Sequence, residues 1–327
     1  MSSLEADCIS NAGLTCRLLT EQLPSPRLSV FYESGIQWQE WRQTGDVITG
    51  RGLNRQIRRA YGFLASRYRP GDRIFLIGYS RGAYGARSLA GLIDRVGLLR
   101  HDAANVRNIR VAWRYYQLGG APETVQAFQQ AHCHEDTDVE MVGVWDTVKA
   151  LGLRLPVVWR FTEPRHAFHN HLLGAHIRHG FQALALDETR NAYAPVLWHT
   201  PDSWNGHVEQ MWFRGSHGDV GGHLLGVEQA RPLSNIPLVW MLERAETCGL
   251  PLPAGWRQRF PCDVEAPSVG TWRGWNKIFL SRTRRVVGSD RSERIHPTAR
   301  DHVRRARIPL RPGAAARVLD DAGVSPT

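Results

Sequence analysis

The feature that most constrains the fold is an apolar run that ends in a tight turn and continues as a helix. Arg73–Tyr79 is a mostly apolar segment of strand length, which is typical of a central parallel strand covered on both faces. After Ser80, the apolar residues of Arg81–Val96 recur with helical spacing, and Gly52–Arg67 has the same pattern. The order helix, strand, turn, helix indicates an α/β fold.

Other segments extend this pattern on both sides of the turn. Val139–Trp145 and Gln210–Arg214 are predicted as strands, and the alternation in Arg27–Tyr32 predicts a short one. Ser234–Cys248 is predicted as a helix, with Ser234 as its N-cap and Gly249 at its end. We therefore expect a mostly parallel central sheet with helices on both faces.

The length of 327 residues is compatible with one domain that carries insertions. We expect a domain over residues 1–310, with an insertion or lid at about 150–205, and a flexible tail over residues 311–327. The apolar runs fall short of the roughly 18–20 residues that cross a bilayer. Residues 1–20 lack the layout of a secretory signal, so we expect a cytoplasmic protein, or one exported without a signal peptide.

Lysine and arginine number 41 against 31 acidic residues, a net charge of +10. Such a surface either attracts polyanions or is only solvated, and we consider peripheral contact with an anionic membrane. Leu153–Trp159 either touches such a membrane or packs in the core. The arginine-rich stretch Arg282–Arg311 has no recognised nucleic-acid module, so nucleic-acid binding is not expected.

Cysteine and histidine spacing predicts no metal and no cofactor. The five cysteines form no CxxC pair and are interpreted as reduced packing residues. The histidines between His166 and His179 match no zinc-binding pattern, so this stretch is interpreted as a polar helix or loop.

Residues 78–82, Gly-Tyr-Ser-Arg-Gly, have the form GxSxG. In a strand-to-helix turn this motif exposes a nucleophilic serine, here Ser80, and Gly78 and Gly82 supply the small neighbours that a strained turn needs. The following helix start favours a developing oxyanion, for which the backbone N–H of Arg81 is one candidate donor. The alternative is a Gly-Ser turn without chemistry.

A serine nucleophile needs a histidine base, and the histidine needs an orienting carboxylate. Asp146 follows a predicted strand, and His217 lies in a glycine-rich loop after another, in the order serine, acid, histidine of α/β-hydrolases. Asp146 is alternatively an N-cap. Asp219 either orients the histidine or pins the loop, and Asp187 is a third candidate acid.

Several separate blocks together resemble a known family. They are residues 77–83, 86–92, 143–148, 185–190, 212–222 and 295–297. In this order they are similar to signature segments of a bacterial and fungal α/β-hydrolase family that includes the type VI secretion phospholipase effectors (Tle-type catalytic domain), over about residues 11–300. The resemblance implies a triad of Ser80, Asp146 and His217 that cleaves an ester in a phospholipid, another lipid or a small molecule.

The chain departs from this family at its start. The family opens with a strand that ends in an Asp-Gly-Thr-type turn near the oxyanion site, and the sequence has no such segment. Either the start of the chain is misassigned, or the first strand of the sheet is missing together with one oxyanion donor. The alternative function is a catalytically inactive protein that uses the hydrolase fold for binding or as a structural part.

Overall fold

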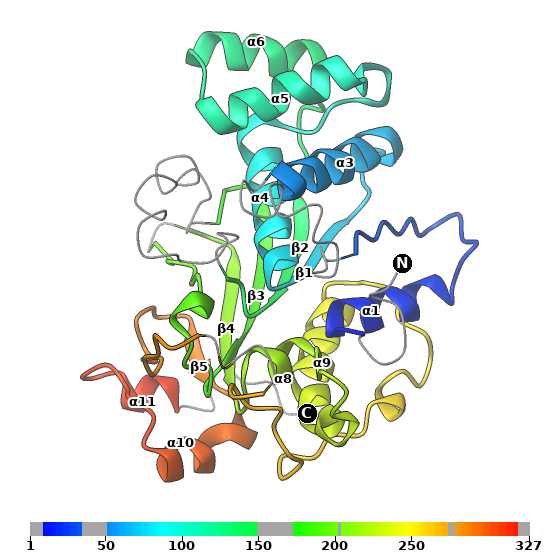
Figure 1. The fold of residues 1–327 in the computed structure, drawn as a ribbon. Helices are drawn as coiled ribbons and strands as arrows, with labels where there is room; N and C mark the ends of the chain where they lie inside the picture. The colour runs from blue at the N-terminus through cyan, green and yellow to red at the C-terminus, as the bar shows by residue number, and fades with distance from the viewer. Residues whose placement is uncertain are drawn as a thin grey trace.

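The computed structural model describes residues 9–34, 51–148, 173–201, 204–273, 277 and 279–319. Five strands form one sheet in the order β1-β2-β3-β4-β5, and every neighbouring pair is parallel (Figure 1). The strands are β1 (Ile74–Tyr79), β2 (Val139–Trp145), β3 (Ile177–Ala185), β4 (His207–Phe213) and β5 (Glu293–Ile295). The predicted α/β fold with a parallel sheet is confirmed.

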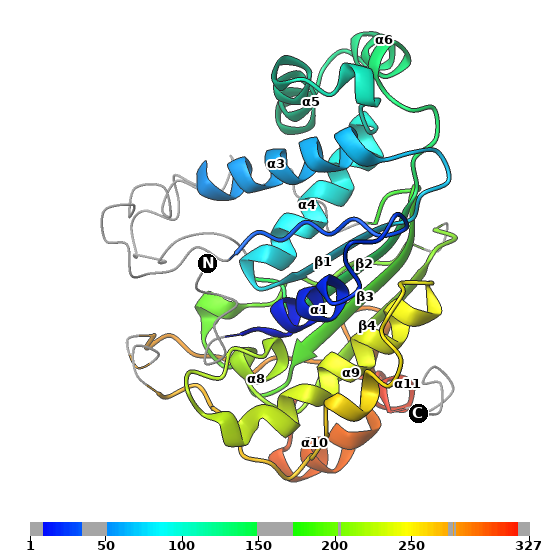
Figure 2. The ribbon, with the colours of Figure 1, turned by 90° about the vertical axis from the view of Figure 1, so that its right-hand side faces the viewer.

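Helices cover both faces of the sheet, as Figure 2 shows. On one face lie α3 (Arg51–Arg67), α4 (Arg81–Val96) and α5 (Val106–Leu118), with α6 (Pro122–His132) beyond them. On the other lie α1 (Asn11–Thr20), α8 (His217–Gly221) and α9 (Arg231–Thr247). Near β4 and β5 lie α10 (Arg300–Ala306) and α11 (Ala315–Val318). Short 3₁₀ helices are η4 (His101–Ala103), η6 (Asn191–Tyr193), η7 (Glu228–Ala230), η8 (Arg257–Arg259) and η10 (Pro297–Ala299).

The central position of β2 follows from its composition. All seven of its residues are buried, because helices cover it on both sides. Val142 and Val144 face the α3–α4 core, whereas Met141 and Trp145 face α9. Truncating a fully buried leucine of α4 such as Leu92 to alanine would cost about 2–5 kcal/mol. This two-sided packing fixes the strand ends that carry the site.

The helix predicted over Gly52–Arg67 and the elements predicted over residues 73–79, 81–96 and 139–145 are confirmed to within a residue. The predicted start of α9 was wrong. The helix begins at Arg231, with a proline in its first turn, so Ser234 is a buried residue inside it and not its N-cap. Gly249 follows α9 with a φ of +87°, which glycine tolerates.

Arg27–Tyr32 is not a strand. Leu28 and Val30 instead pack against the core around α9 without joining the ladder. No strand precedes β1 among the residues that the structure describes. The core strand β3 lies inside the range of about 150–205 predicted as an insertion, so the insertion does not include it. Most of the remainder, with Leu153–Trp159, lies outside the described residues.

The tail predicted over residues 311–327 contains a short ordered helix, α11, whose Val318 is fully buried, so the prediction of flexibility was wrong there. Cys16, Cys133, Cys248 and Cys262 are free thiols, and Cys8 lies outside the described residues. Within the described segments no helix combines the length and apolar character that a membrane crossing requires.

Candidate active site

Ser80 lies at the turn between β1 and α4. Its backbone has φ 57° and ψ −118°, a conformation that costs a non-glycine residue about 1–3 kcal/mol. Its N–H donates to the carbonyl of Trp145 at 3.1 Å and so ties the turn to the end of β2. A Cβ on Gly78 would lie 2.4 Å from the Gly82 carbonyl oxygen, so only glycine fits there. The strained turn presents the serine at the carboxyl edge of the sheet.

Gly82 differs from Gly78. A Cβ built on Gly82 meets no atom within 4 Å, so the prediction that both glycines are needed for space is wrong for the second one. Arg81 is the first residue of α4, so its backbone N–H belongs to the helix start, where N–H groups point away from the helix body. Burial lowers the pKa of its guanidinium. Its role as oxyanion donor stays a prediction.

Asp146 follows β2 and is completely buried. Its φ of 38° is also strained. The following Thr147 belongs to no helix and Val148 forms a β-bridge with Pro195, so the N-cap alternative is wrong. The carboxylate accepts from His217 Nδ1 at 2.6 Å and from the backbone N–H of Ala185 at 3.1 Å. These two hydrogen bonds orient the carboxylate.

The third partner of Asp146 is Arg285, which forms a bidentate ion pair with it. Arg285 Nη1 lies 2.5 Å from Oδ1 and Nη2 lies 2.9 Å from Oδ2. Burial raises the pKa of the Asp146 carboxyl, but the Arg285 charge and the hydrogen bonds from His217 and Arg285 outweigh burial. The pKa lies well below its usual range. The acid is therefore ionised at neutral pH.

His217 connects the acid to the serine. It is the first residue of α8, after the N-cap Ser216, and only 5% of it is exposed. Its Nε2 lies 2.9 Å from Ser80 Oγ. Because an ionised Asp146 only accepts, Nδ1 carries the proton and donates, which leaves Nε2 to accept the serine hydroxyl. The predicted residues Ser80, Asp146 and His217 thus form one continuous hydrogen-bonded chain.

Two aromatic rings hold the imidazole between them. The ring centroids of Tyr79 and Tyr193 each lie 4.8 Å from that of His217. The Tyr79 hydroxyl donates to the His217 carbonyl at 3.1 Å. A Cβ on Gly221 would overlap the Tyr79 ring, so the glycine-rich loop is shaped to admit this ring. Packing and hydrogen bonding together fix the orientation of the histidine.

Glu188 holds the glycine-rich loop through the backbone of His217. It is 1% exposed and accepts from the backbone N–H of His217 at 3.2 Å. It also accepts from Arg190 Nε at 2.8 Å and Nη2 at 2.5 Å. Burial raises the pKa of the Glu188 carboxyl, but the hydrogen bonds and the charge of Arg190 outweigh burial, so this pKa lies below its usual value. The sequence contained the signal for this pair in the block at residues 185–190, but not its role.

The two other candidate acids do not contact His217 side-chain nitrogens. Asp187 accepts from the Gly215 N–H at 2.7 Å and from His302 Nε2 at 2.7 Å. Asp219 accepts at Oδ2 from Ser216 N–H at 2.7 Å and at Oδ1 from Val269 N–H at 2.8 Å. Both carboxylates pin the glycine-rich loop, which was the structural alternative for Asp219.

Sequence reasoning missed Arg285 altogether. The side chain is 5% exposed and also donates to the carbonyls of Ala185 at 2.8 Å and Tyr193 at 2.6 Å. It lies within the arginine-rich stretch 282–311, where Arg282 likewise bonds Thr271 Oγ1 at 2.9 Å. Part of the basic charge of this stretch is therefore used inside the protein.

The amino-acid sequence matches known proteins at the level of family. A family model described as "T6SS, Phospholipase effector Tle1-like, catalytic domain" matches residues 3–244, more than half of the chain. The uncharacterized protein YEL023C of Saccharomyces cerevisiae is 30% identical over 159 residues, which cover 45% of this chain and 22% of that protein.

Two solved structures also match. One is the Tle1 effector bound to the VgrG spike from the Type 6 secretion system, with 22% identity and a TM-score of 0.29 over 53% of this chain and 30% of that one. The other is an uncharacterized protein from Pseudomonas aeruginosa, with 17% identity and a TM-score of 0.33 over 79% of this chain and 40% of that one. The chain spans less than half the length of each relative.

Proposed function

The chain belongs to the Tle1-like catalytic-domain family of phospholipase effectors, and on this premise we propose that it is a serine hydrolase that cleaves a carboxyl ester in a phospholipid or another lipid. Ser80 is the nucleophile, His217 the general base and acid, and Asp146 the orienting carboxylate. The observation that carries the proposal is His217 bonded at both ring nitrogens, at 2.6 Å to Asp146 and 2.9 Å to Ser80.

The reaction follows from this geometry in two halves. Ser80 Oγ bonds to the ester carbonyl carbon while its proton passes to His217 Nε2, and the Arg81 N–H donates to the developing oxyanion. The ester C–O bond then breaks, and His217 returns the proton to the leaving alcohol, which leaves an acyl group on Ser80. Water attacks the acyl carbon with the same proton transfers and releases the fatty acid.

The charge of the protein supports a lipid surface as the place of reaction. A net charge of +10 favours contact with anionic lipid, by roughly 1 kcal/mol for each basic side chain that reaches the surface. The contact is proposed to be peripheral. Small soluble esters would be cleaved by the same triad without this contribution.

A catalytically inactive protein is the second candidate, because a triad alone, without its oxyanion donors, does not give fast catalysis. An oxyanion donor is worth about 2.7–4 kcal/mol, or 10²–10³ in kcat. The strained backbone at Ser80 and Asp146 favours the enzyme, since strain of this kind persists mainly at functional sites. Both candidates share the fold, so only chemistry separates them.

The test is reaction with a fluorophosphonate probe, which modifies activated serines. Wild-type protein and Ser66→Ala, a serine variant on α3 away from the turn, should label equally. Ser80→Ala should not label, and Asp146→Asn should lower the labelling rate by about 10⁴-fold because the imidazole tautomer is lost. Folded wild-type protein without any labelling would support the inactive alternative.

Substrate class is tested with vesicles. Release of fatty acid and lysophospholipid from phosphatidylglycerol-containing vesicles is followed by mass spectrometry and compared with hydrolysis of a short-chain nitrophenyl ester. We expect vesicle hydrolysis to fall with added salt, because screening weakens the contact. Hydrolysis of the soluble ester alone would retain the serine hydrolase and refute the lipid substrate.

A further inference from the structure

A second group of reactive side chains lies far from the triad. Glu140 on β2, His179 on β3 and Cys248 at the end of α9 each offer a ligand atom, and these atoms lie within 4.8 Å of one another. Glu140 is six residues before Asp146 on an extended strand, so the group lies about 20 Å from the triad acid, at the opposite edge of the sheet. No step of the proposed hydrolysis uses it.

A local irregularity places Glu140 in the group. In the β1–β2 register, Ile74 pairs with Val139 and Phe75 pairs with Met141, so Glu140 is an extra residue on β2. A bulge of this kind re-aims a side chain. Glu140 is 8% exposed, and its Oε1 lies 3.5 Å from His179 Nδ1. Its Oε2 is 3.4 Å from Arg178 Nη1, which leaves Oε1 as the oxygen toward the group.

His179 is prepared to act as a ligand through Nε2. Its Nδ1 lies 2.9 Å from the backbone carbonyl oxygen of Glu140, and a carbonyl only accepts, so Nδ1 carries the proton. A metal-binding histidine usually donates its other ring N–H to such a carbonyl, which fixes the tautomer and the ring. The side chain is 32% exposed, so an ion can reach it from solvent.

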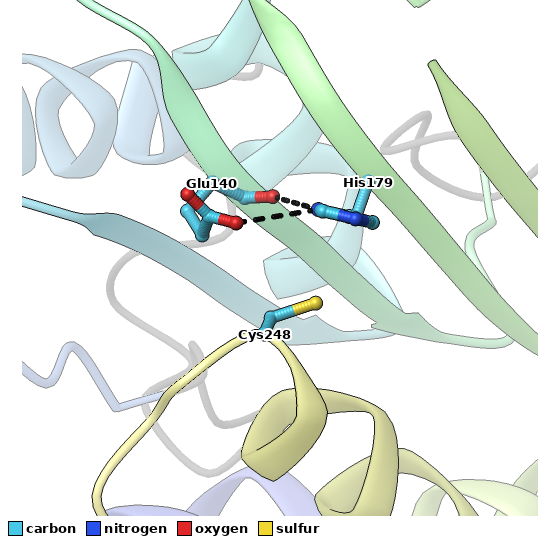
Figure 3. A group of neighbouring side chains, drawn as sticks. All are labelled: Glu140, His179 and Cys248. Atoms are coloured by element: carbon cyan, nitrogen blue, oxygen red, sulfur yellow. Dashed lines mark hydrogen bonds and ion pairs between the residues drawn. The ribbon is translucent and has the colours of Figure 1, made fainter.

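Cys248 supplies a buried sulfur. It caps α9 through its N–H to the Arg244 carbonyl at 3.0 Å, and its own carbonyl accepts from Arg73 Nη1 at 3.2 Å. It is 7% exposed, and among the described residues its Sγ has no hydrogen-bond partner, whereas Cys133 Sγ donates to the Val96 carbonyl at 3.4 Å. Figure 3 shows the Cys248 sulfur pointing from the helix end toward His179 and Glu140.

We propose that Glu140, His179 and Cys248 bind one Zn²⁺ ion, with water as the fourth ligand. Sulfur, imidazole nitrogen and carboxylate oxygen are all zinc ligands, and thiolate with imidazole favours zinc over magnesium or calcium. Tetrahedral bond lengths of about 2.0–2.3 Å require ligand atoms about 3.4–3.6 Å apart, so the ligand atoms approach one another by about 1 Å or more. Glu140 Oε1, which lies 3.5 Å from Nδ1, moves to the Nε2 side of the His179 ring as the ion binds. The thiol proton leaves to solvent as the ion binds.

The ion fastens the end of α9 to the first residues of β2 and β3. Glu140 and His179 are 39 residues apart and Cys248 lies a further 69 residues along the chain, so the site exists only in the folded chain and the ion stabilises that state by binding to it. The role is structural, and it is independent of the proposed hydrolysis.

The direct test is zinc content and affinity in untagged protein. After loading with Zn²⁺ and dialysis, elemental analysis should find one zinc per wild-type chain, and competition with a chromophoric chelator gives the Kd. Cys248→Ser and His179→Gln should each weaken binding by at least about 100-fold, since loss of outer-shell partners alone costs 10–100-fold. Cys262→Ser and His176→Gln, an exposed thiol and a neighbouring histidine, are the matched controls and should bind as wild type.

Two further measurements distinguish the loss of zinc binding from the loss of folding. Co²⁺ in place of Zn²⁺ should give a thiolate-to-cobalt absorption band in wild type that Cys248→Ser lacks, with circular dichroism of both recorded. Zn²⁺ should raise the unfolding midpoint of wild type and leave that of His179→Gln unchanged. Wild-type protein without bound zinc, or zinc bound equally by both ligand variants, overturns the proposal.

Discussion

Replacing Arg285 by methionine leaves the triad acid as a buried charge without its cationic partner. Asp146 is 0% exposed and loses both bonds of its bidentate partner. Removing one member of a buried ion pair costs about 3–5 kcal/mol. The change is large against a total stability of about 5–15 kcal/mol, and it lowers the unfolding midpoint by about 6–10 °C at roughly 2 °C per kcal/mol.

The loss of folding stability in Arg285→Met should depend on pH, because the Asp146 carboxyl titrates differently in the variant and in wild type. In wild type its depressed pKa means that its contribution to stability is fully present above the unfolded value of about 3.9 and is lost as pH falls through the folded value. In Arg285→Met, burial becomes the main influence and raises the pKa, so the folded state takes up a proton. The gap between variant and wild type should therefore narrow as pH falls from 7 toward 4.

The assay is thermal unfolding combined with the rate of fluorophosphonate labelling. Arg284→Met is the matched control, because this neighbouring arginine is exposed and donates to the backbone carbonyls of Ala306 and Arg307, and it should change stability little. Adding Asp146→Asn to Arg285→Met removes the stranded charge. The double variant should be more stable than Arg285→Met alone and equally slow to label.

This reasoning fails if the effects of Arg285→Met and Asp146→Asn on unfolding simply add, because additivity means that the two side chains are not coupled. It also fails if Arg285→Met keeps wild-type stability at pH 7. Retained stability with slowed labelling would make Arg285 a positioning residue whose ion pair contributes no net stability.

Four other variants test the site and one buried histidine outside it. Gly78→Ala should abolish probe labelling and lower stability, because its new Cβ would overlap the backbone of Gly82. Gly82→Ala should have the unfolding midpoint and the labelling rate of wild type, because its Cβ meets no atom. Glu188→Gln should cost about 3–5 kcal/mol in chemical denaturation by stranding its buried arginine partner, and a loss below 1 kcal/mol would refute this. Burial lowers the pKa of His296 to about 4, so the unfolded state binds the proton first and wild-type stability should fall as pH drops from about 6.5 toward 4. A pH titration of unfolding in His296→Gln should show a smaller fall, with the remainder due to His134 and His223, whose pKa values burial also lowers.

The local pattern around Ser80 predicted both its strand and its helix, because a strand or a helix is encoded by its own apolar spacing. The order of Ser80, Asp146 and His217 along the chain also predicted which side chains meet, since the ends of parallel strands share one edge. Pattern alone failed for Arg27–Tyr32. Alternation describes one buried face, and Leu28 and Val30 obtain that burial without pairing to a neighbouring strand.

The sequence by itself determined the α/β class and the triad candidates. Only the tertiary structure decided that Arg285, 139 residues from Asp146 in the chain, neutralises the triad acid. It also decided that Glu140, His179 and Cys248 lie together. The physical reason is range: backbone periodicity acts over a few residues, whereas a buried charge or thiol finds its neighbours only when sheet and helices pack.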